Sequence, residues 1–406
     1  MRVSSLTVPL ALCCTWCAPV LAASGPTSKP AAGWVVVGQP GITGQQVMCC
    51  QMAFNSKNVP HIAFKDYRAG GRASVMRLAG DTWQPLGPPG AASLGSAWYC
   101  RLAFDRRDRL YLVSRDYGAR GDGHVVMFDP AAKEPRWIDV GPSSAVSPMA
   151  THWTDIAVSS TGVPYVAFAD RRTNPEGKKP TDPNDDRATV VRVVAGKWLT
   201  VGPMGFSPAA ARFPSIALGP GDVPYVAYQC RRQGGKLSVM KFDTPTSGWG
   251  YVGKPGCSAK QMSNPVIRID AKGVPHAAFI CHADGAMRYE VRVLRFNGAK
   301  WTRVGGAASG DDYATLQTEG WRQWISLDFD RAGRPCVAYQ VGRARGAKAA
   351  VRRFDGKAWM PLGALGFTPA AADYLAMACD TTGGPWIVFR DGAHGQSVTV
   401  MKYTGK

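Results

Sequence analysis

The chain has 406 residues, of which 45% are hydrophobic, so it is long enough for one large repeat domain or two ordinary domains with a substantial core. Its 46 glycines and 30 prolines favour many short strands joined by turns over long helices. The formal net charge of +19 at pH 7 excludes an acidic surface and favours anionic partners. An equally weighted alternative is that the basic charge only keeps an exported protein soluble.

Residues 1–22 are typical of a secretory signal peptide. Arg2 gives a positive start, the residues that follow are mainly apolar, and the small Ala22 suits cleavage. The apolar run is short and is interrupted by Pro9 and Pro19, which argues against a retained membrane anchor. We therefore expect a secreted or periplasmic protein without a membrane span, in which residues 23–33 form a short flexible lead.

An internal repeat dominates the rest of the chain. The pattern W-x-x-x-G occurs seven times, at intervals of 49 to 61 residues. The seven pairs are Trp34/Gly38, Trp83/Gly87, Trp137/Gly141, Trp198/Gly202, Trp249/Gly253, Trp301/Gly305 and Trp359/Gly363. A unit of this length that recurs seven times indicates a ring of similar sheets.

Each repeat passes through the same stages. After the glycine come a loop, a short apolar strand such as 216–218, and a turn that Pro closes in six of the seven repeats. A second strand follows at once, as in 225–228, and a third strand alternates, as in 237–242. These runs have the period, length and composition of β-strands, and the Trp-led segment is the fourth.

These observations predict an all-β protein, a seven-bladed β-propeller of four-stranded antiparallel blades over residues 34–406. Each tryptophan is expected to pack between neighbouring blades, and its glycine to allow the turn into the next blade. The last repeat has only three strands, whereas Trp34–Val37 precedes the first complete blade. We therefore expect this N-terminal strand to complete the last blade and close the ring.

The repeats, of the form W-x-x-V-G followed by P-Y-V-A-Y and V-M-K-F, resemble those of secreted bacterial β-propellers, and also sialidase-like and fungal lectin-like propellers. The resemblance is to an architecture and not to an active site. The Asp-box of sialidases, S-x-D-x-G-x-T-W, is absent. A shared fold of this kind does not assign a function.

Aromatic residues recur where each first strand begins, on the face where the loops after the second and fourth strands meet. Aligned positions carry Cys49, Tyr99, Trp153, Phe213, Asn264, Trp324 and Tyr374. One residue earlier are Met48, Trp98, His152, Arg212, Ser263, Gln323 and Asp373. Such a ring suits stacking against sugar rings. The alternative is that the aromatics only plug the top of the channel.

Acidic and basic residues follow the second strands. Asp66, Asp116, Asp170 and Asp391 end four of them, and Arg171 and Arg231 are among the basic residues that follow. The recurrence favours a structural role for the aspartates, as caps of their loops. An arginine cluster on this face would select an acidic ligand.

Two long loops stand out. The loop 305–324 carries Glu319, Trp321 and Arg322, and extra length in a compact ring often marks a binding loop. The insertion 173–187 contains Asp182, Asp185 and Asp186, but its spacing fits no known calcium loop, and we expect a solvated tip.

Eight cysteines remain beyond residue 22, and an even number in an oxidising compartment suggests disulfides. No pair has the spacing of zinc ligands, so we expect no metal and no cofactor. Repeat positions point to three candidate pairs, namely Cys50 with Cys100, Cys230 with Cys257, and Cys336 with Cys379.

Three functions stay open. The first is binding of an acidic carbohydrate or another anionic polymer. Its candidate residues are Trp98, Tyr99, His152, Trp153, Arg171, Arg212, Arg231, Trp321, Arg322, Trp324 and Tyr374. The second is a carbohydrate-active enzyme, a hydrolase or a uronate lyase, with Asp155, Glu319, Asp373 or His152 as candidate catalytic groups. The third is an envelope interaction scaffold. We expect a monomer and no nucleic-acid partner.

Overall fold

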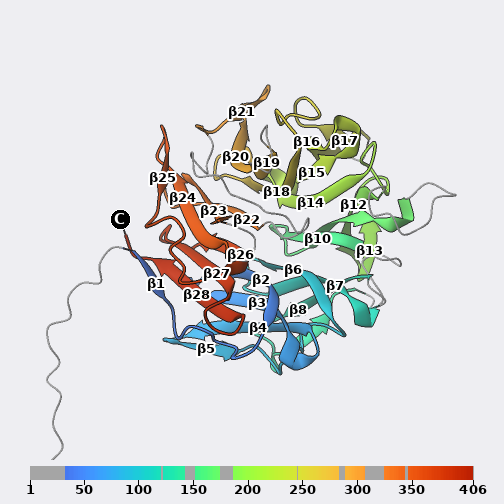
Figure 1. The fold of residues 1–406 in the computed structure, drawn as a ribbon. Helices are drawn as coiled ribbons and strands as arrows, with labels where there is room; N and C mark the ends of the chain where they lie inside the picture. The colour runs from blue at the N-terminus through green and yellow to red at the C-terminus, as the bar shows by residue number, and fades with distance from the viewer. Residues whose placement is uncertain are drawn as a thin grey trace, which may run out of the picture. The chain divides into compact units, whose positions relative to one another are not determined.

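The computed structural model describes residues 33–119, 122–141, 151–173, 186–244, 246–282, 289–306, 324–342 and 346–405. Within them seven four-stranded antiparallel sheets stand around a central axis, which confirms the predicted propeller (Figure 1). The predicted signal peptide, and all of the lead except Gly33, lie outside the described residues.

Each blade runs from the axis outward. The inner strands are β2 (Val47–Phe54), β6 (Ala97–Phe104), β10 (Thr151–Val158), β14 (Ala211–Leu218), β18 (Met262–Ile269), β22 (Ile325–Phe329) and β26 (Ala372–Cys379). The second strands are β3 (Pro60–Asp66), β7 (Leu110–Asp116), β11 (Pro164–Asp170), β15 (Pro224–Cys230), β19 (Pro275–His282), β23 (Pro335–Val341) and β27 (Pro385–Asp391).

The third strands are β4 (Arg72–Ala79), β8 (Asp122–Phe128), β12 (Arg187–Val194), β16 (Lys236–Thr244), β20 (Tyr289–Phe296), β24 (Lys348–Phe354) and β28 (Ser397–Tyr403). The outer strands are β5 (Thr82–Pro85), β9 (Trp137–Asp139), β13 (Lys197–Thr200), β17 (Gly248–Tyr251), β21 (Trp301–Arg303), β25 (Trp359–Pro361) and, in blade seven, β1 (Trp34–Val36).

The described helices are single 3-10 turns, and none is long and apolar enough to cross a bilayer. They are η1 (Tyr67–Ala69), η2 (Tyr117–Ala119), η3 (Arg171–Thr173), η4 (Pro220–Asp222) and η5 (Arg231–Gln233).

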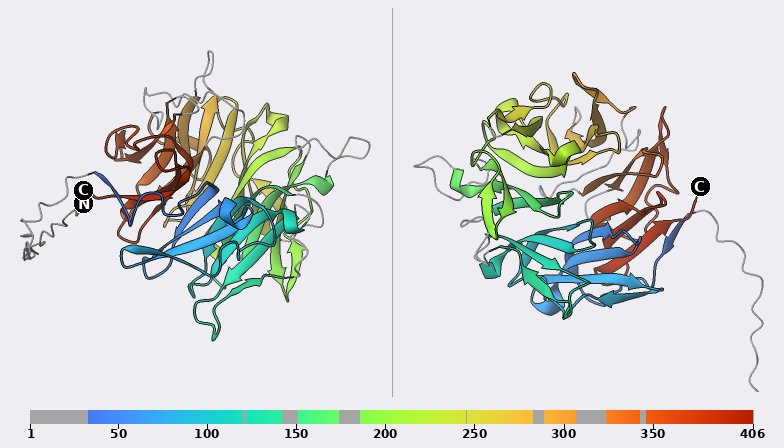
Figure 2. Two further views of the ribbon diagram at one scale, coloured as in Figure 1. Left: turned by 60° about the horizontal axis from the view of Figure 1, so that its bottom comes forward. Right: turned by 180° about the vertical axis from the view of Figure 1, so that it is seen from behind.

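The core lies between the blades, because each sheet packs one face against the preceding blade and the other face against the following blade. The second strands show this best, since β3, β11 and β27 are buried along their whole length. Proline starts six of the second strands, where the missing N–H costs no ladder bond. The neighbouring blades are seen stacked in two further views (Figure 2).

The W-x-x-x-G pattern builds the contact between blades, as predicted. The indole N–H of Trp83 donates to the carbonyl oxygen of Val37 at 2.9 Å, and the same bond recurs at all seven tryptophans. Gly38, which follows Val37, has a φ of +78°, and a Cβ there would lie 2.9 Å from the Trp83 ring. A side chain would therefore displace the tryptophan of the next blade.

The N-terminal strand closes the ring, which confirms the predicted closure. β1 pairs with β28 in the register Trp34↔Tyr403 and Val36↔Met401. The Gly33 carbonyl accepts the N–H of Thr404 at 2.9 Å. The last sheet therefore contains both ends of the described chain, side by side in Figure 1.

Candidate functional site: an axial pocket

The aromatic positions predicted at the start of the first strands lie inside these strands, not before them. In β2 the four residues from Met48 to Gln51 face the three residues from Lys65 to Ala63 of β3, so one extra residue forms a bulge. Five further inner strands have the same shift or the same left-handed residue, and the six φ values run from 49° to 55°. The six residues are Cys49, Tyr99, Trp153, Phe213, Asn264 and Tyr374.

A left-handed backbone is unfavourable for bulky side chains, and such residues persist only where the surroundings hold them. Bulges of this kind re-aim side chains and occur often beside functional sites. Four of the six residues, Tyr99, Trp153, Phe213 and Asn264, line a pocket on the axis. We call these six residues together with Trp324 the axial ring.

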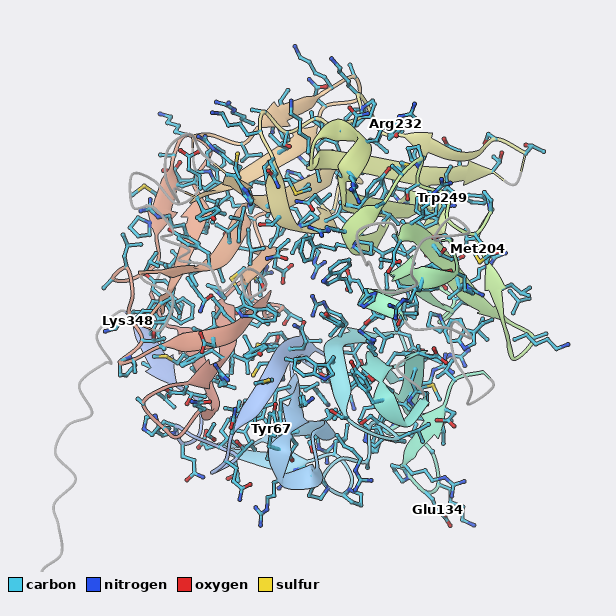
Figure 3. All side chains as sticks on the ribbon, turned by 45° about the vertical axis from the view of Figure 1, so that its right-hand side comes forward. Tyr67, Glu134, Met204, Arg232, Trp249 and Lys348 are labelled. Carbon is cyan, nitrogen blue, oxygen red and sulfur yellow. The ribbon has the colours of Figure 1, made fainter. Side chains whose placement is uncertain are left out.

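Five of the seven residues of the axial ring, all except Cys49 and Tyr374, line a cavity of about 190 Å³ on the propeller axis. Four aromatic side chains line it, from Tyr99, Trp153, Phe213 and Trp324. Trp153 packs against Phe213 with ring centroids 4.8 Å apart, and Trp324 against Tyr374 at 4.5 Å. Figure 3 shows the side chains that converge on this central space.

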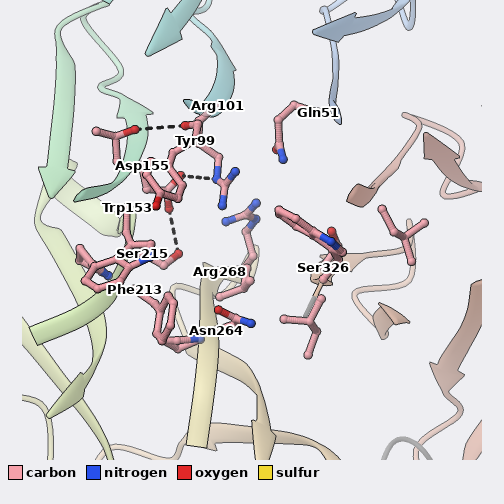
Figure 4. A pocket seen from close by; sticks show the side chains of 17 residues that line it. Gln51, Tyr99, Arg101, Trp153, Asp155, Phe213, Ser215, Asn264, Arg268 and Ser326 are labelled. Atoms are coloured by element: carbon pink, nitrogen blue, oxygen red, sulfur yellow. Dashed lines mark hydrogen bonds and ion pairs between the residues drawn. The ribbon is translucent and has the colours of Figure 1, made fainter. Parts of the chain in front are cut away.

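Two arginines point into the cavity. The guanidinium groups of Arg101 and Arg268 both point toward the middle of the cavity, and the amide of Gln51 points toward the same space (Figure 4). Arg101 Nη1 donates to the Cys100 carbonyl at 3.0 Å, and Arg268 Nη1 to the Ile267 carbonyl at 2.9 Å. These backbone bonds fix the arginine heads and leave further N–H groups of each fork for a ligand.

Among the described residues that line this cavity, Asp155 is the one carboxylate. Its Oδ1 lies 3.6 Å from Arg101 Nε and accepts the Ile156 N–H. Its Oδ2 accepts the Ser215 hydroxyl at 2.9 Å and the Ile216 N–H at 3.0 Å. These donors hold the Asp155 carboxylate in one orientation, in which it can position Arg101.

The described part of the lining, with Arg101, Arg268 and Asp155, therefore carries an excess of one positive charge. Asp328 lies near Arg268. Burial raises the pKa of Asp328, although the Cys379 N–H and the charge of Arg268 each lower it. Its oxygens accept N–H groups from Cys379 and Phe329 instead of turning into the cavity. Asp328 thus compensates Arg268 only in part, and the cavity keeps a positive potential.

Of the predicted binding residues, Tyr99, Trp153 and Trp324 line the cavity, and so does the predicted catalytic candidate Asp155. Tyr374 is buried and packs between Trp324 and Arg390, whose guanidinium carbon lies 4.9 Å from the Tyr374 ring. Its role in the structure is to fill the wall behind Trp324.

The residues one step earlier make contacts within the scaffold. Asp373 forms an ion pair with Arg390 and accepts a bond from Gln340. His152 Nδ1 lies 3.0 Å from Asp186 Oδ2. Arg212 interacts with another residue of the protein, and it stands opposite Gln229 in the pairing of β14 with β15. Trp98 lies outside the cavity, against Lys65.

Asp186, in the insertion before β12, is fully buried. The expectation that this residue belongs to a solvated tip was therefore wrong. The His152 ring covers Asp186. Arg171 starts η3 beside this pair, and its Nε is buried without a partner. Arg231 is exposed at the start of η5. Glu319, Trp321 and Arg322 lie outside the described residues, as do Asp182 and Asp185.

The aspartates that end the second strands cap their loops. Asp66 accepts the Arg68 N–H, and Asp391 accepts the Ala393 N–H. Asp170 accepts the Arg172 N–H and also pairs with the Arg172 guanidinium. The preferred structural interpretation of these residues is confirmed.

All eight described cysteines are free thiols, so none of the three candidate pairs is bonded in this structure. Cys336 and Cys379 pack in one cluster, where their thiols hydrogen bond to each other. Cys50 and Cys100 share another cluster. Cys230 and Cys257 belong to different clusters. No group of three metal-binding side chains is found in the described part of the chain.

Comparison with known proteins supports the fold. No family model matches the chain, and no curated protein matches it significantly. The BP39L lectin from Burkholderia pseudomallei is 14% identical with a TM-score of 0.56, over 93% of this chain and 97% of the lectin. A PL25 polysaccharide lyase, an ulvan lyase, is 12% identical with a TM-score of 0.52, over 91% and 95% of the two chains. At such identities the likeness shows a shared propeller fold with a lectin and a carbohydrate-active enzyme.

Proposed function

We propose that the protein is an exported carbohydrate-binding propeller that recognises an acidic sugar in its axial pocket. The observation that carries this proposal is the pair of guanidinium groups, Arg101 and Arg268, that converge inside a ring of aromatic side chains. Aromatic faces stack on sugar rings, and guanidinium forks bind carboxylate or sulfate through paired hydrogen bonds. The lectin-like architecture is consistent with this role.

The size of the pocket limits what enters it. About 190 Å³ is below the range of roughly 300–1,000 Å³ that is typical of pockets for drug-sized ligands. A single acidic sugar ring suits this volume, whereas an internal stretch of a polymer would have to thread the channel. A polymer ligand is therefore expected to present one terminal residue to Arg101 and Arg268.

Isothermal titration with matched sugar pairs tests the proposal. Glucuronate against glucose, and galacturonate against galactose, change little except the acidic group. The uronates should bind and the neutral sugars should bind at least tenfold more weakly, because a hydrogen bond to a charged group contributes about 1.5–3 kcal/mol. Galactose 6-sulfate distinguishes sulfate from carboxylate as the preferred group.

Arg268→Gln should weaken uronate binding by about tenfold or more and leave the Asp155 network intact. Arg136→Gln is the matched control, because it removes the same charge from an arginine whose side chain is 74% exposed. Equal binding of acidic and neutral sugars, or an equal loss in the control, would contradict the proposal.

Export is part of the proposal and has its own test. Expression of the full chain with its N-terminus intact should yield a mature protein outside the cytoplasm that begins near Ala23. N-terminal sequencing of the periplasmic and culture fractions measures this. Recovery of the uncut chain in the cytoplasm alone would remove export from the proposal.

A lyase is the second candidate, and one observation favours it. The contact between His152 Nδ1 and Asp186 would fix the His152 tautomer and leave Nε2 to take a proton. His152 is next to Trp153, which lines the pocket. Incubation with acidic polysaccharides should then release unsaturated, ultraviolet-absorbing ends, and His152→Ala should abolish them. No such release from any uronate polymer would leave binding as the function.

A further inference from the structure

Two tyrosines on neighbouring blades hold the same place and are both exposed. Tyr67 starts η1 after Asp66, and Tyr117 starts η2 after Asp116. Their exposed fractions are 41% and 53%, and Leu94, in the loop between the two blades, is 51% exposed. These side chains form an exposed apolar surface on the loop face of blades one and two.

Cationic groups lie against these rings and connect them. Lys65 Nζ is 3.9 Å from the Trp98 ring centroid and 5.5 Å from that of Tyr67. The Arg115 guanidinium lies 5.1 Å from the Tyr117 ring, and Arg115 stands directly opposite Trp98 in the ladder. Tyr67, Trp98 and Tyr117 thus make a continuous row, which we call the aromatic row.

The two cations have different parts in this row. Lys65 is 3% exposed and donates to Ser96 Oγ at 2.7 Å, and burial lowers the pKa of its ammonium. Lys65 therefore contacts the Tyr67 and Trp98 rings from their buried side. Arg115 is half-buried and brings its charge closer to the surface.

The acidic groups of this region are withdrawn from the surface. Asp66 is buried and accepts the Arg68 N–H and the Ser74 hydroxyl. Asp116 is fully buried and accepts the N–H groups of Leu94, Gly95 and Gly118. The surface is left aromatic and positive, which complements a ring-shaped anion.

The aromatic row leads into the axial pocket. Trp98 is followed in the chain by Tyr99, which lines the pocket. Burial raises the pKa of Tyr99, and the charges of Arg115 and Tyr117 also act on it, the first lowering and the second raising it. Arg115 stands opposite Trp98 in the pairing of β6 with β7, one residue along the chain from Tyr99. A ligand in the pocket would meet this row as it leaves.

We propose that the aromatic row forms additional subsites, on which the second and following residues of an acidic oligosaccharide stack while its terminal residue occupies the axial pocket. This inference rests on the proposed function and extends it from one sugar to an oligomer. Arg115 would meet an acidic group of a residue on the row, and Tyr67 and Tyr117 would stack on sugar faces. The preferred ligand is then the end of an acidic chain.

Titration with oligomers of increasing length tests the inference. The probes are galacturonate and its 1,4-linked oligomers of two to six residues, and hyaluronan fragments of the same lengths. Affinity should rise with length in the wild type, by roughly three- to tenfold for each ring that is engaged. Tyr67→Ala and Tyr117→Ala should flatten this rise and leave monosaccharide binding unchanged.

Met204→Ala is the matched control, because Met204 is 46% exposed in another part of the ring. Thermal unfolding checks that each variant keeps its fold. Monosaccharide binding without any gain with length, or a full gain in both tyrosine variants, would overturn the inference alone. Absence of binding to every uronate, short or long, would instead overturn the proposed function.

Discussion

The indole N–H of Trp34 donates to the backbone carbonyl oxygen of Leu362 at 2.6 Å. The donor belongs to the first strand, and the acceptor precedes Gly363 at the end of blade six. The Trp34 ring also stacks on Phe367, with centroids 4.4 Å apart. The ring of blades is therefore closed by a hydrogen bond and a stacked pair as well as by the pairing of β1 with β28.

Trp34→Phe should keep the stacking and remove the donor, which leaves the Leu362 carbonyl without this partner. We expect a loss of about 1 kcal/mol in the free energy of unfolding, measured by urea denaturation. Trp198→Phe is the comparison, because its N–H makes the same bond to Val140 at 3.0 Å between two internal blades. Unchanged stability in both variants would show that the tryptophan hydrogen bonds between blades make no net contribution to the free energy of unfolding.

Gly202 and Gly196 provide a matched test of the contact between blades. Both have a φ of +74°, so alanine costs a similar backbone strain of about 1–2 kcal/mol at each. A Cβ at Gly202 would lie 2.8 Å from the Phe242 ring and 3.0 Å from the Trp249 ring, whereas no atom lies within 4 Å at Gly196. Gly202→Ala should therefore cost about 1–3 kcal/mol more than Gly196→Ala in denaturant melts. Equal losses would mean that the tryptophan shifts freely.

Blade two contains a buried histidine between two carboxylates. His124 Nδ1 lies 3.1 Å from Asp116, and its Nε2 lies 2.9 Å from Asp139. Burial alone would lower the pKa of His124, but the hydrogen bonds with both aspartates reverse this and raise it. A raised pKa gives stabilisation that is full below the unfolded value of about 6.5 and is lost as pH rises through the folded value.

The free energy of unfolding of the wild type minus that of His124→Gln should therefore fall as pH rises from about 5 to 9. Denaturant melts at each pH measure it. The comparison with His124→Gln is needed because His61 also changes stability with pH. Burial lowers the pKa of His61 to about 4, so the contribution of His61 to the free energy of unfolding falls as pH decreases. A difference that stays constant with pH would contradict the charged state assigned to His124.

Cys336 and Cys379 are expected to form a disulfide between blades six and seven. The thiols hydrogen bond to each other, and that bond together with burial raises the pKa of Cys379. The thiolate is therefore scarce in the folded protein, so oxidation should be slow after folding and efficient during it. Each bond would remove two electrons and two protons, which reduce one glutathione disulfide to two glutathiones.

Refolding with glutathione disulfide, followed by alkylation and peptide mass spectrometry, should detect the linked pair. The bond should stabilise the protein by about 2–4 kcal/mol, and Cys336→Ser should abolish this gain. Cys257→Ser serves as the control, because the Cys257 thiol contacts the Leu237 carbonyl instead. Unlinked peptides after oxidative refolding would refute the prediction.

The architecture could be predicted from the sequence because each repeat encodes one blade and its contact with the next blade. The seven Trp–Gly pairs mark the contacts between blades, and the unpaired strand at Trp34 indicates how the ring closes. The aromatic positions of the axial ring follow from the same alignment, and three predicted binding residues line the pocket.

The arginines of the pocket could not be found in this way. Arg268 stands where five other blades carry alanine, as at Ala103, and that contrast was an available signal. Arg101 aligns with polar residues such as Gln51 and Asp155, so its position offered no such contrast. The bulge breaks the alternation of side chains, because one extra residue exchanges the two faces of the strand. Counting from Tyr99 by twos was therefore not a safe guide. The burial of Asp186 depends on a contact with His152 that no local pattern reveals.

The pairing of β1 with β28 also sets an order of events in biosynthesis. The hydrogen bond between Gly33 and Thr404 spans 371 residues, so its two partners are synthesised 371 residues apart. At about 5–20 residues per second, the first strand waits roughly 20–70 seconds for its neighbour. During that time its hydrophobic residues, such as Val35, have no sheet to join. Chaperones that bind nascent chains would therefore have to protect this short segment for the longest time.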